Sequence, residues 1–189
     1  KEETFFNKMD YNQGWFDSPL TELGLKQAEK TKEFIKDIHI DYCFSSPSER
    51  AVDTVEMMLD GRNIKIIRDK RLKEMNFGMF EGYPNSLFRA VNAGISEVME
   101  ETLEDFDGES KEQVINRELD CIRELEKNYP GQTILIGGHG VSLKELMLAL
   151  TKDDIYQFIP DFKWMSNCDT VVIEGDQLNY HIVDYYRIK

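Results

Sequence analysis

The stretch "GQTILIGGHGVSLKELMLAL", residues 131–150, indicates the fold. Its short apolar run at residues 133–136 is typical of a buried strand. A helical pattern follows, for which Ser142 and Glu145 offer a capping box. Between strand and helix, His139 stands among glycines, which permit backbone conformations and close approaches that a side chain would block. A strand, a glycine-rich turn and a helix in this order form the repeating unit of an α/β protein.

Strand and helix signals alternate along the rest of the chain, with no internal repeat and no linker. Strands are predicted at residues 40–44, 63–68, 133–136, 170–173 and 179–185, the last two joined by a turn at Gly175-Asp176. Helices are predicted at residues 21–38, from Ser46 onward, from Ser142 onward, and in two stretches of 83–129 that break near Asp107-Gly108. We therefore expect one domain, residues 1–189, with a three-layer α/β/α fold, a mostly parallel central sheet and one antiparallel edge strand.

The helix after residues 40–44 has a clear start signal in "SPSERAVDTVEMMLD". Ser46 can cap this helix, Pro47 suits its first position, and Glu49 completes a capping box. Arg50 then lies in the first turn, near the carboxyl end of the preceding strand.

Composition excludes several classes of partner. The 189 residues carry 23 basic and 36 acidic side chains, a net charge of -13, which opposes attraction to nucleic acid or to an anionic membrane. Cys43, Cys121 and Cys168 form no CxxC pair and are odd in number, so we expect buried free thiols in a reducing compartment. No apolar stretch approaches the ~20 residues that span a bilayer, and the chain opens on "KEE" rather than on a leader, so a soluble cytoplasmic protein is expected.

A guanidinium and an imidazole follow the ends of two predicted strands. Arg50 follows residues 40–44 and His139 follows residues 133–136, so both should reach the same rim of a parallel sheet. Helix amino ends at such a rim attract anions, and a guanidinium can bind one bidentately. Alternatively, His139 is a hydrogen-bonded structural residue and Arg50 a surface charge. His39 and His181 lack this setting and are expected to be structural.

Several motifs together resemble those of the histidine phosphatase superfamily, which is also called phosphoglycerate-mutase-like. They occur in the family's order between residues 3 and 169 and read "QGWFDSPLTELGLKQA" (13–28), "FSSPSERAVDT" (44–54), "LKEMNFGMFEG" (72–82), "GES" (108–110) and "GGHGVSL" (137–143). Members transfer a phosphoryl group from a phosphomonoester to a histidine and then usually to water. The resemblance implies that His139 is the second, phosphate-holding histidine and that Glu74 donates a proton to the leaving oxygen. It assigns phosphate binding to Arg50, Asn7 and Gly140, and a pocket wall to Gln13, Gly14 and Ser18.

One family motif is incomplete. The family opens with a strand that ends in Arg-His-Gly, which carries the nucleophilic histidine, and "ETFFN" (3–7) matches only the residues after that tripeptide. We expect the missing part upstream of Lys1; the alternative is a truncated, inactive molecule.

The leading hypothesis is a phosphomonoesterase that hydrolyses small phosphorylated metabolites through a phosphohistidine. The alternatives are a phosphoglycerate mutase and an inactive relative that only binds phospho-ligands. Met75 and Asn76 follow Glu74, where mutases carry further basic residues, and this favours hydrolysis. The resemblance implies a helical cover over the pocket at about residues 83–107, whose acidic side chains could repel polyanions or simply face solvent: Glu97, Glu100, Glu101, Glu104 and Asp105. Neither metal-ligand spacing nor a nucleotide-binding loop is present, so no metal or other cofactor is expected. A homodimer is the candidate assembly.

Overall fold

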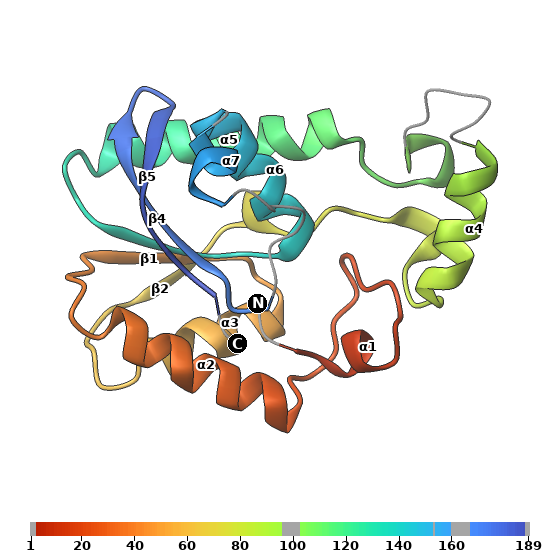
Figure 1. Ribbon diagram of the computed structural model, residues 1–189, viewed down its shortest axis with the longest axis horizontal. Coiled ribbons are helices and arrows are strands. Elements are labelled where there is room, and N and C mark those ends of the chain that lie inside the picture. Colours follow the sequence, from red (N-terminus) through yellow and green to blue (C-terminus); the bar gives the residue numbers. More distant parts are fainter. Residues whose placement is uncertain (1–2, 96–102, 153, 160–166, 188–189) are drawn as a thin grey trace.

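The central element is a three-stranded parallel sheet with the order β2-β1-β3 (Figure 1). A computed structural model describes residues 3–95, 103–152, 154–159 and 167–187. The strands are β1 (Tyr42–Ser45), β2 (Ile66–Arg68) and β3 (Ile134–Gly137), with Cys43 opposite Ile66 and Leu135. The helices are α1 (Phe5–Lys8), α2 (Glu22–Ile35), α3 (Glu49–Met58), α4 (Asn85–Ile95), α5 (Lys111–Asn128), α6 (Gly140–Thr151) and α7 (Asp154–Phe158), with short 3-10 turns η1 (Lys70–Leu72), η2 (Gly78–Phe80) and η3 (Leu103–Phe106).

The strands separate two apolar cores, one on each face of the sheet. Because side chains alternate along a strand, Cys43 and Leu135 join the core under α2 and α3. Phe44 and Ile136 point the other way, into the core formed with α5 and α6. Figure 1 shows α2 and α3 on one side of the sheet and α5 and α6 on the other. The predicted three-layer α/β/α class with a mostly parallel sheet is therefore confirmed.

The last two strands, β4 (Thr170–Asp176) and β5 (Asn179–Tyr186), form an antiparallel hairpin. Within the described residues this hairpin is a sheet of its own rather than an edge strand of the parallel sheet. The turn predicted at Gly175-Asp176 is wrong, since Asp176 pairs with Asn179 and the turn residues are Gln177 and Leu178, both at positive φ. Gly175 serves close packing inside β4, where a Cβ would come within 2.2 Å of the Asn179 carbonyl oxygen.

Both capping boxes predicted at the sheet rim are wrong. Helix α3 begins at Glu49 with Ser48 as its N-cap, because the Ser46 hydroxyl bonds instead to Ser48 and to the ring of His139. Helix α6 begins at Gly140, two residues before Ser142, and its N-cap is His139. The Ser46 side chain, which could have capped α3, is thus used at the rim, where the two loops meet.

Helix α4 and η3 belong to the predicted cover segment. Phe88 packs edge-to-face on Phe77 and Phe80, which attaches α4 to η2, and Asp10 accepts a hydrogen bond from Asn85. The acidic positions Glu97, Glu100 and Glu101 lie outside the described residues, whereas Glu104 and Asp105 are exposed on η3. No helix in the described ranges has the length and apolarity to cross a membrane.

Candidate active site

His139 lies at the carboxyl end of β3 and is almost completely buried. Its Nε2 is 2.7 Å from the Oγ of Ser46, which follows β1, so the two loops are joined at the sheet rim. Gly137, which ends β3, allows α3 to pack closely on this strand, because a Cβ there would lie 2.5 Å from Cγ1 of Val55. The predicted meeting of the two strand ends is thus seen directly in the His139–Ser46 contact.

Glu74 reaches the same rim through its carboxyl group. Its Oε1 accepts hydrogen bonds of 2.9 Å from the backbone N–H of Ser142 and of Met75, and its Oε2 accepts one of 3.3 Å from Val141. These donors include orphan N–H groups of the first turn of α6, which favour an anionic partner. The carboxyl group of Glu74 therefore lies at the first turn of α6, whose N-cap is His139.

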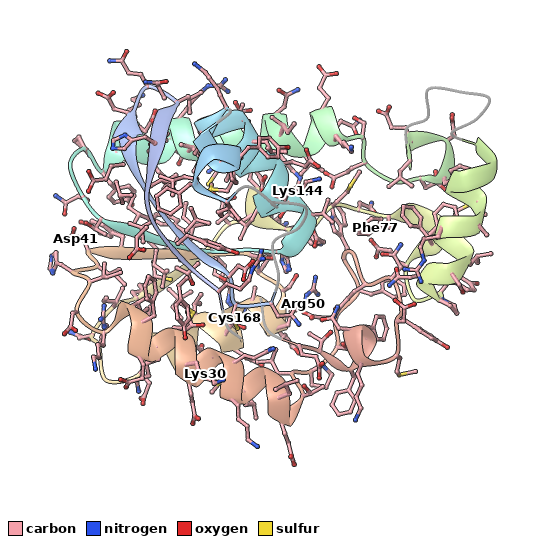
Figure 2. All side chains as sticks on the ribbon, viewed as in Figure 1. Lys30, Asp41, Arg50, Phe77, Lys144 and Cys168 are labelled. Atoms are coloured by element: carbon pink, nitrogen blue, oxygen red, sulfur yellow. The ribbon has the colours of Figure 1, made fainter. Side chains whose placement is uncertain are left out.

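Arg50 lies on α3 with a fully buried side chain, so it is not the surface charge that was the alternative reading. Its Nη1 donates to the Phe16 carbonyl at 2.8 Å and to the Asp17 carboxylate at 2.9 Å, and its Nη2 donates to the Gly14 carbonyl at 2.8 Å. Its Nε has no partner among the described residues. Nε–H shares one edge of the guanidinium with one of the two Nη2–H groups, and such an edge can bind a phosphate bidentately. Figure 2 shows Arg50 at the opposite end of β1 from Asp41.

The remaining predicted site residues fall into two groups. Gly14 and Gly140 contact the core of the site, since Gly14 holds Arg50 and Gly140 follows His139 as the first residue of α6. Asn7, Gln13 and Ser18 instead hold the segment around α1 together. The Asn7 side chain caps α1, and buried Gln13 donates to Ser18 at 3.1 Å. Within the described residues, none of these three forms a hydrogen bond with Arg50, His139 or Glu74.

Comparison with known proteins assigns the chain to a family. The family model described as the histidine phosphatase superfamily (branch 1) matches residues 3–187. The chain belongs to this superfamily. Phosphoserine phosphatase 1 of Hydrogenobacter thermophilus is 28% identical over 180 residues, which cover 88% of this chain and 78% of that protein.

Solved structures of the superfamily agree with this assignment. YhfR of Bacillus stearothermophilus is 30% identical, with a TM-score of 0.81, and the match covers 96% of this chain and 91% of that one. A phosphoglycerate mutase from Bacillus anthracis is 27% identical, with a TM-score of 0.78, and the match covers 96% and 88% of the two chains. The predicted resemblance is confirmed, and this superfamily member shares its fold with proteins named both phosphatase and mutase.

The residues that hold Glu74 in place were not predicted from the sequence. Arg117 on α5 donates to the carbonyls of Arg71, Lys73 and Glu74 at 2.6 to 3.0 Å, and it pairs with Glu109 at 2.9 Å. Glu109 belongs to the "GES" motif of the superfamily. Its partner Arg117 lies eight residues later in the chain, and this spacing is the signal from which the pair could have been predicted. Trp15 is a second such residue, since its Nε1 donates to the Glu74 carbonyl at 2.8 Å.

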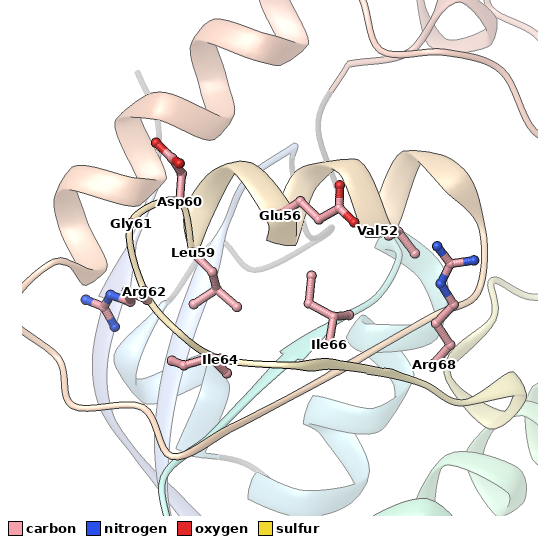
Figure 3. A pocket seen from close by; sticks show the side chains of 9 residues that line it. All are labelled: Val52, Glu56, Leu59, Asp60, Gly61, Arg62, Ile64, Ile66 and Arg68. Atoms are coloured by element: carbon pink, nitrogen blue, oxygen red, sulfur yellow. The ribbon is translucent and has the colours of Figure 1, made fainter.

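Other predicted features lie away from this site. His39 pairs with Asp41 at 2.9 Å on the surface, and His181 lies within β5 opposite Glu174. None of the three cysteines forms a disulfide within the described part of the chain, and all three are buried, as expected. A surface hollow of about 470 Å³ lies between α3 and the segment leading through β2 (Figure 3). It is lined by none of the predicted site residues: Val52, Glu56, Leu59, Asp60, Gly61, Arg62, Ile64, Ile66 and Arg68.

Proposed function

We propose that the protein is a phosphomonoesterase that hydrolyses small phosphorylated metabolites through a phosphohistidine intermediate. The observation that carries this proposal is the arrangement of Arg50, His139 and Glu74 around the ends of β1 and β3, with the Nε–H of Arg50 left without a partner among the described residues. Membership of the superfamily supports it. So does the similarity over most of the chain to a protein named phosphoserine phosphatase.

Each of the three side chains has a chemical task in this proposal. A transferring phosphoryl group spreads negative charge over its equatorial oxygens, and fixed donors aimed at those oxygens lower the barrier. The Nε and Nη2 edge of Arg50 and the imidazole of His139 supply such donors. Glu74, when protonated, delivers a proton to the leaving alcohol, and Arg117 and Trp15 fix its backbone carbonyl.

We propose that the nucleophilic histidine lies on the segment expected upstream of Lys1. In space, this segment would be an extended strand between β3 and β4. Within the described chain β3 pairs only with β1 and β4 only with β5, so an unpaired edge of each remains. A cavity of about 170 Å³ is lined by residues of both strands, including Ile134, Ile136 and Val171. Open apolar edges are ordinarily paired or covered. A strand here, parallel to β3, would end beside His139, where the superfamily's Arg-His-Gly is required.

The two residues directly after Glu74 are not basic, and this favours water as the acceptor of the phosphoryl group. Met75 is buried, and the side-chain oxygen of Asn76 accepts a hydrogen bond from the Gly78 N–H. Neither residue offers a positive charge for a second anionic group in the way that the mutase alternative requires.

The test is phosphate release from a panel of phosphomonoesters by the protein expressed from its complete gene, with a chelator present. We expect turnover and an acid-labile phosphoryl-enzyme. His139→Ala and Arg50→Ala should each lower kcat/KM by about 100-fold or more, the usual loss of a transition-state donor, while the control His181→Ala stays unchanged. Phosphoglycerate interconversion without hydrolysis would support a mutase instead. Binding of phosphate esters without either reaction would refute catalysis.

A further inference from the structure

A buried acid on α5, Glu118, has no role in the proposed function. Its side chain is completely buried, and neither of its carboxyl oxygens has a hydrogen-bond partner among the described residues. An ionised carboxylate in such surroundings would lose its hydration without gaining donors, so burial holds Glu118 as a neutral acid. The neutral form carries an O–H group that can donate a hydrogen bond.

The cation next to Glu118 in the sequence has other partners. Each N–H donor of Arg117 has an acceptor, either a backbone carbonyl in residues 71–74 or a carboxyl oxygen of Glu109. The charged groups of η1 and α6, which pack on α5, are exposed (Lys70) or form ion pairs of their own: Arg71 with Asp69 and Glu124, and Lys144 with Glu145. Burial raises the pKa of Glu118 to about 8, Arg117 opposes this shift, and the charges of Glu74 and Glu109 add to it.

One polar group of α6 complements the neutral acid. The hydroxyl of Ser142 is also buried and without a hydrogen-bond partner among the described residues. Ile122 of α5 and Leu146 of α6 belong to the same core, and Glu118 and Ser142 each lie one helical turn before these residues. Because α5 packs along α6 (Figure 1), the acid and the hydroxyl meet between the two helices, where the hydroxyl affects the pKa of the acid.

Ser142 connects this acid to the candidate site. Its backbone N–H donates to Oε1 of Glu74 at 2.9 Å, and His139 is the N-cap of the same helix. The charge of Glu74 raises the pKa of Glu118, so the two carboxyl groups interact across the first turn of α6. A second anion bound at this rim would interact with Glu118 in the same sense.

We propose that Glu118 is a positioning residue that controls phosphate affinity. As a neutral acid it supports the first turn of α6 through the Ser142 hydroxyl, and after losing its proton it repels the bound anion. The inference rests on the proposed function, in which a phosphate binds beside Arg50, His139 and Glu74. Because coupling between two sites is reciprocal, the bound phosphate must also hold the proton on Glu118. Glu118 therefore acts without touching the substrate.

The test measures the Kd of inorganic phosphate by calorimetry for the protein expressed from its complete gene. The two conditions, pH 7 and pH 9, lie on either side of the Glu118 pKa of about 8. Glu118→Gln keeps a neutral donor at both pH values. We expect this variant to match wild type within about threefold at pH 7 and to bind phosphate about fivefold more tightly than wild type at pH 9, as a coupling of about tenfold implies. The ionisation of phosphate itself is the same for both proteins and cancels in the ratio.

Two further measurements separate charge repulsion from a loss of folding. At pH 8 phosphate binding to wild type should take up about 0.4 proton more than binding to Glu118→Gln, which calorimetry in buffers of different ionisation enthalpy records. Ser142→Ala removes a hydroxyl that lowers the pKa of Glu118, so its phosphate binding should begin to weaken at a higher pH than in wild type. Circular dichroism checks folding under each condition, and the proton uptake at pH 8 decides the test if wild type is unfolded at pH 9.

Glu112→Gln, which removes an exposed carboxylate from the same helix, is the matched control, and its phosphate binding should follow wild type at both pH values. The same pH dependence and the same proton uptake in wild type and Glu118→Gln would overturn the role of Glu118 while leaving the phosphate site intact. Failure of the wild-type protein to bind phosphate at pH 7 would overturn the proposed function and this inference together.

Discussion

Glu118 should make folding stability depend on pH in a way that one substitution removes. This residue lies on α5, is completely buried, and has no hydrogen-bond partner for either carboxyl oxygen among the described residues. Burial raises its pKa from 4.5 to about 8, helped by the charges of Glu74 and Glu109 and opposed by Arg117 and the nearby Ser142 hydroxyl. At neutral pH the folded protein therefore carries Glu118 as a neutral acid.

The sign and size of the effect follow from proton linkage. Between pH 4.5 and 8 the unfolded chain releases this proton and the folded chain keeps it. Stability is therefore fully present below pH 4.5 and declines with rising pH until about pH 8. Each pH unit costs about 1.4 kcal/mol, so the penalty is about 1 kcal/mol at pH 5 and about 3 kcal/mol at pH 7.

Glu118→Gln keeps the shape and removes the titration. The constant cost of burying an amide cancels when two pH values are compared, so the stability of the variant relative to wild type should improve by about 2 kcal/mol from pH 5 to pH 7. Urea unfolding at both pH values measures this difference. Glu112→Gln, exposed on the same helix, is the control and should show no comparable change. A relative stability of Glu118→Gln that is the same at both pH values, within about 0.5 kcal/mol, would refute the reasoning.

Two further predictions concern packing and thiol chemistry. Gly78→Ala should destabilise the protein by more than about 2 kcal/mol in urea unfolding, because Gly78 has positive φ and its Cβ would lie 1.9 Å from the Phe106 carbonyl oxygen. Gly61→Ala has positive φ but open space around it, so only about 1 kcal/mol of backbone strain is expected, and equal losses for the two variants would contradict the steric argument. Burial raises the pKa of Cys43 and Cys121 to about 12, so at pH 8.5 iodoacetamide should label both about a thousandfold more slowly in the folded than in the urea-unfolded protein. Rapid labelling of the folded protein, located by mass spectrometry, would show that these thiols are accessible.

The sequence predicted the fold class because apolar periodicity reports which faces are buried. The run at residues 133–136 became β3, and the alternation between Cys43 and Phe44 now separates two cores. The hairpin strands were also found from their pattern, whereas their turn was misplaced. A glycine in a strand and a glycine in a turn look alike in sequence, and only the cross-strand approach at Gly175 distinguishes them.

The positions of Arg50 and His139 at the sheet rim were predicted from the sequence, whereas the contacts that support Glu74 were not. Arg50 and His139 follow two strand ends, and parallel topology alone brings those ends together. The capping-box prediction at Ser46 was wrong because a serine hydroxyl can bond to other groups than the backbone of its own helix. Ser46 bonds to His139, which lies 93 residues away in the sequence. Hydrogen bonds between residues far apart in the sequence, including those of Arg117 and Trp15 with Glu74, cannot be predicted from the local sequence pattern.

The three acceptors that hold Arg50 have a thermodynamic consequence for ligand capture. A long flexible side chain normally loses about 0.5 to 1.5 kcal/mol of rotamer freedom when it is immobilised on a ligand. In this protein folding has already immobilised the guanidinium, because Gly14, Phe16 and Asp17 fix it before any anion arrives. In the proposed function a tetrahedral oxyanion therefore meets a rigid receptor at Arg50, and calorimetry should record its binding with little entropic penalty from the protein.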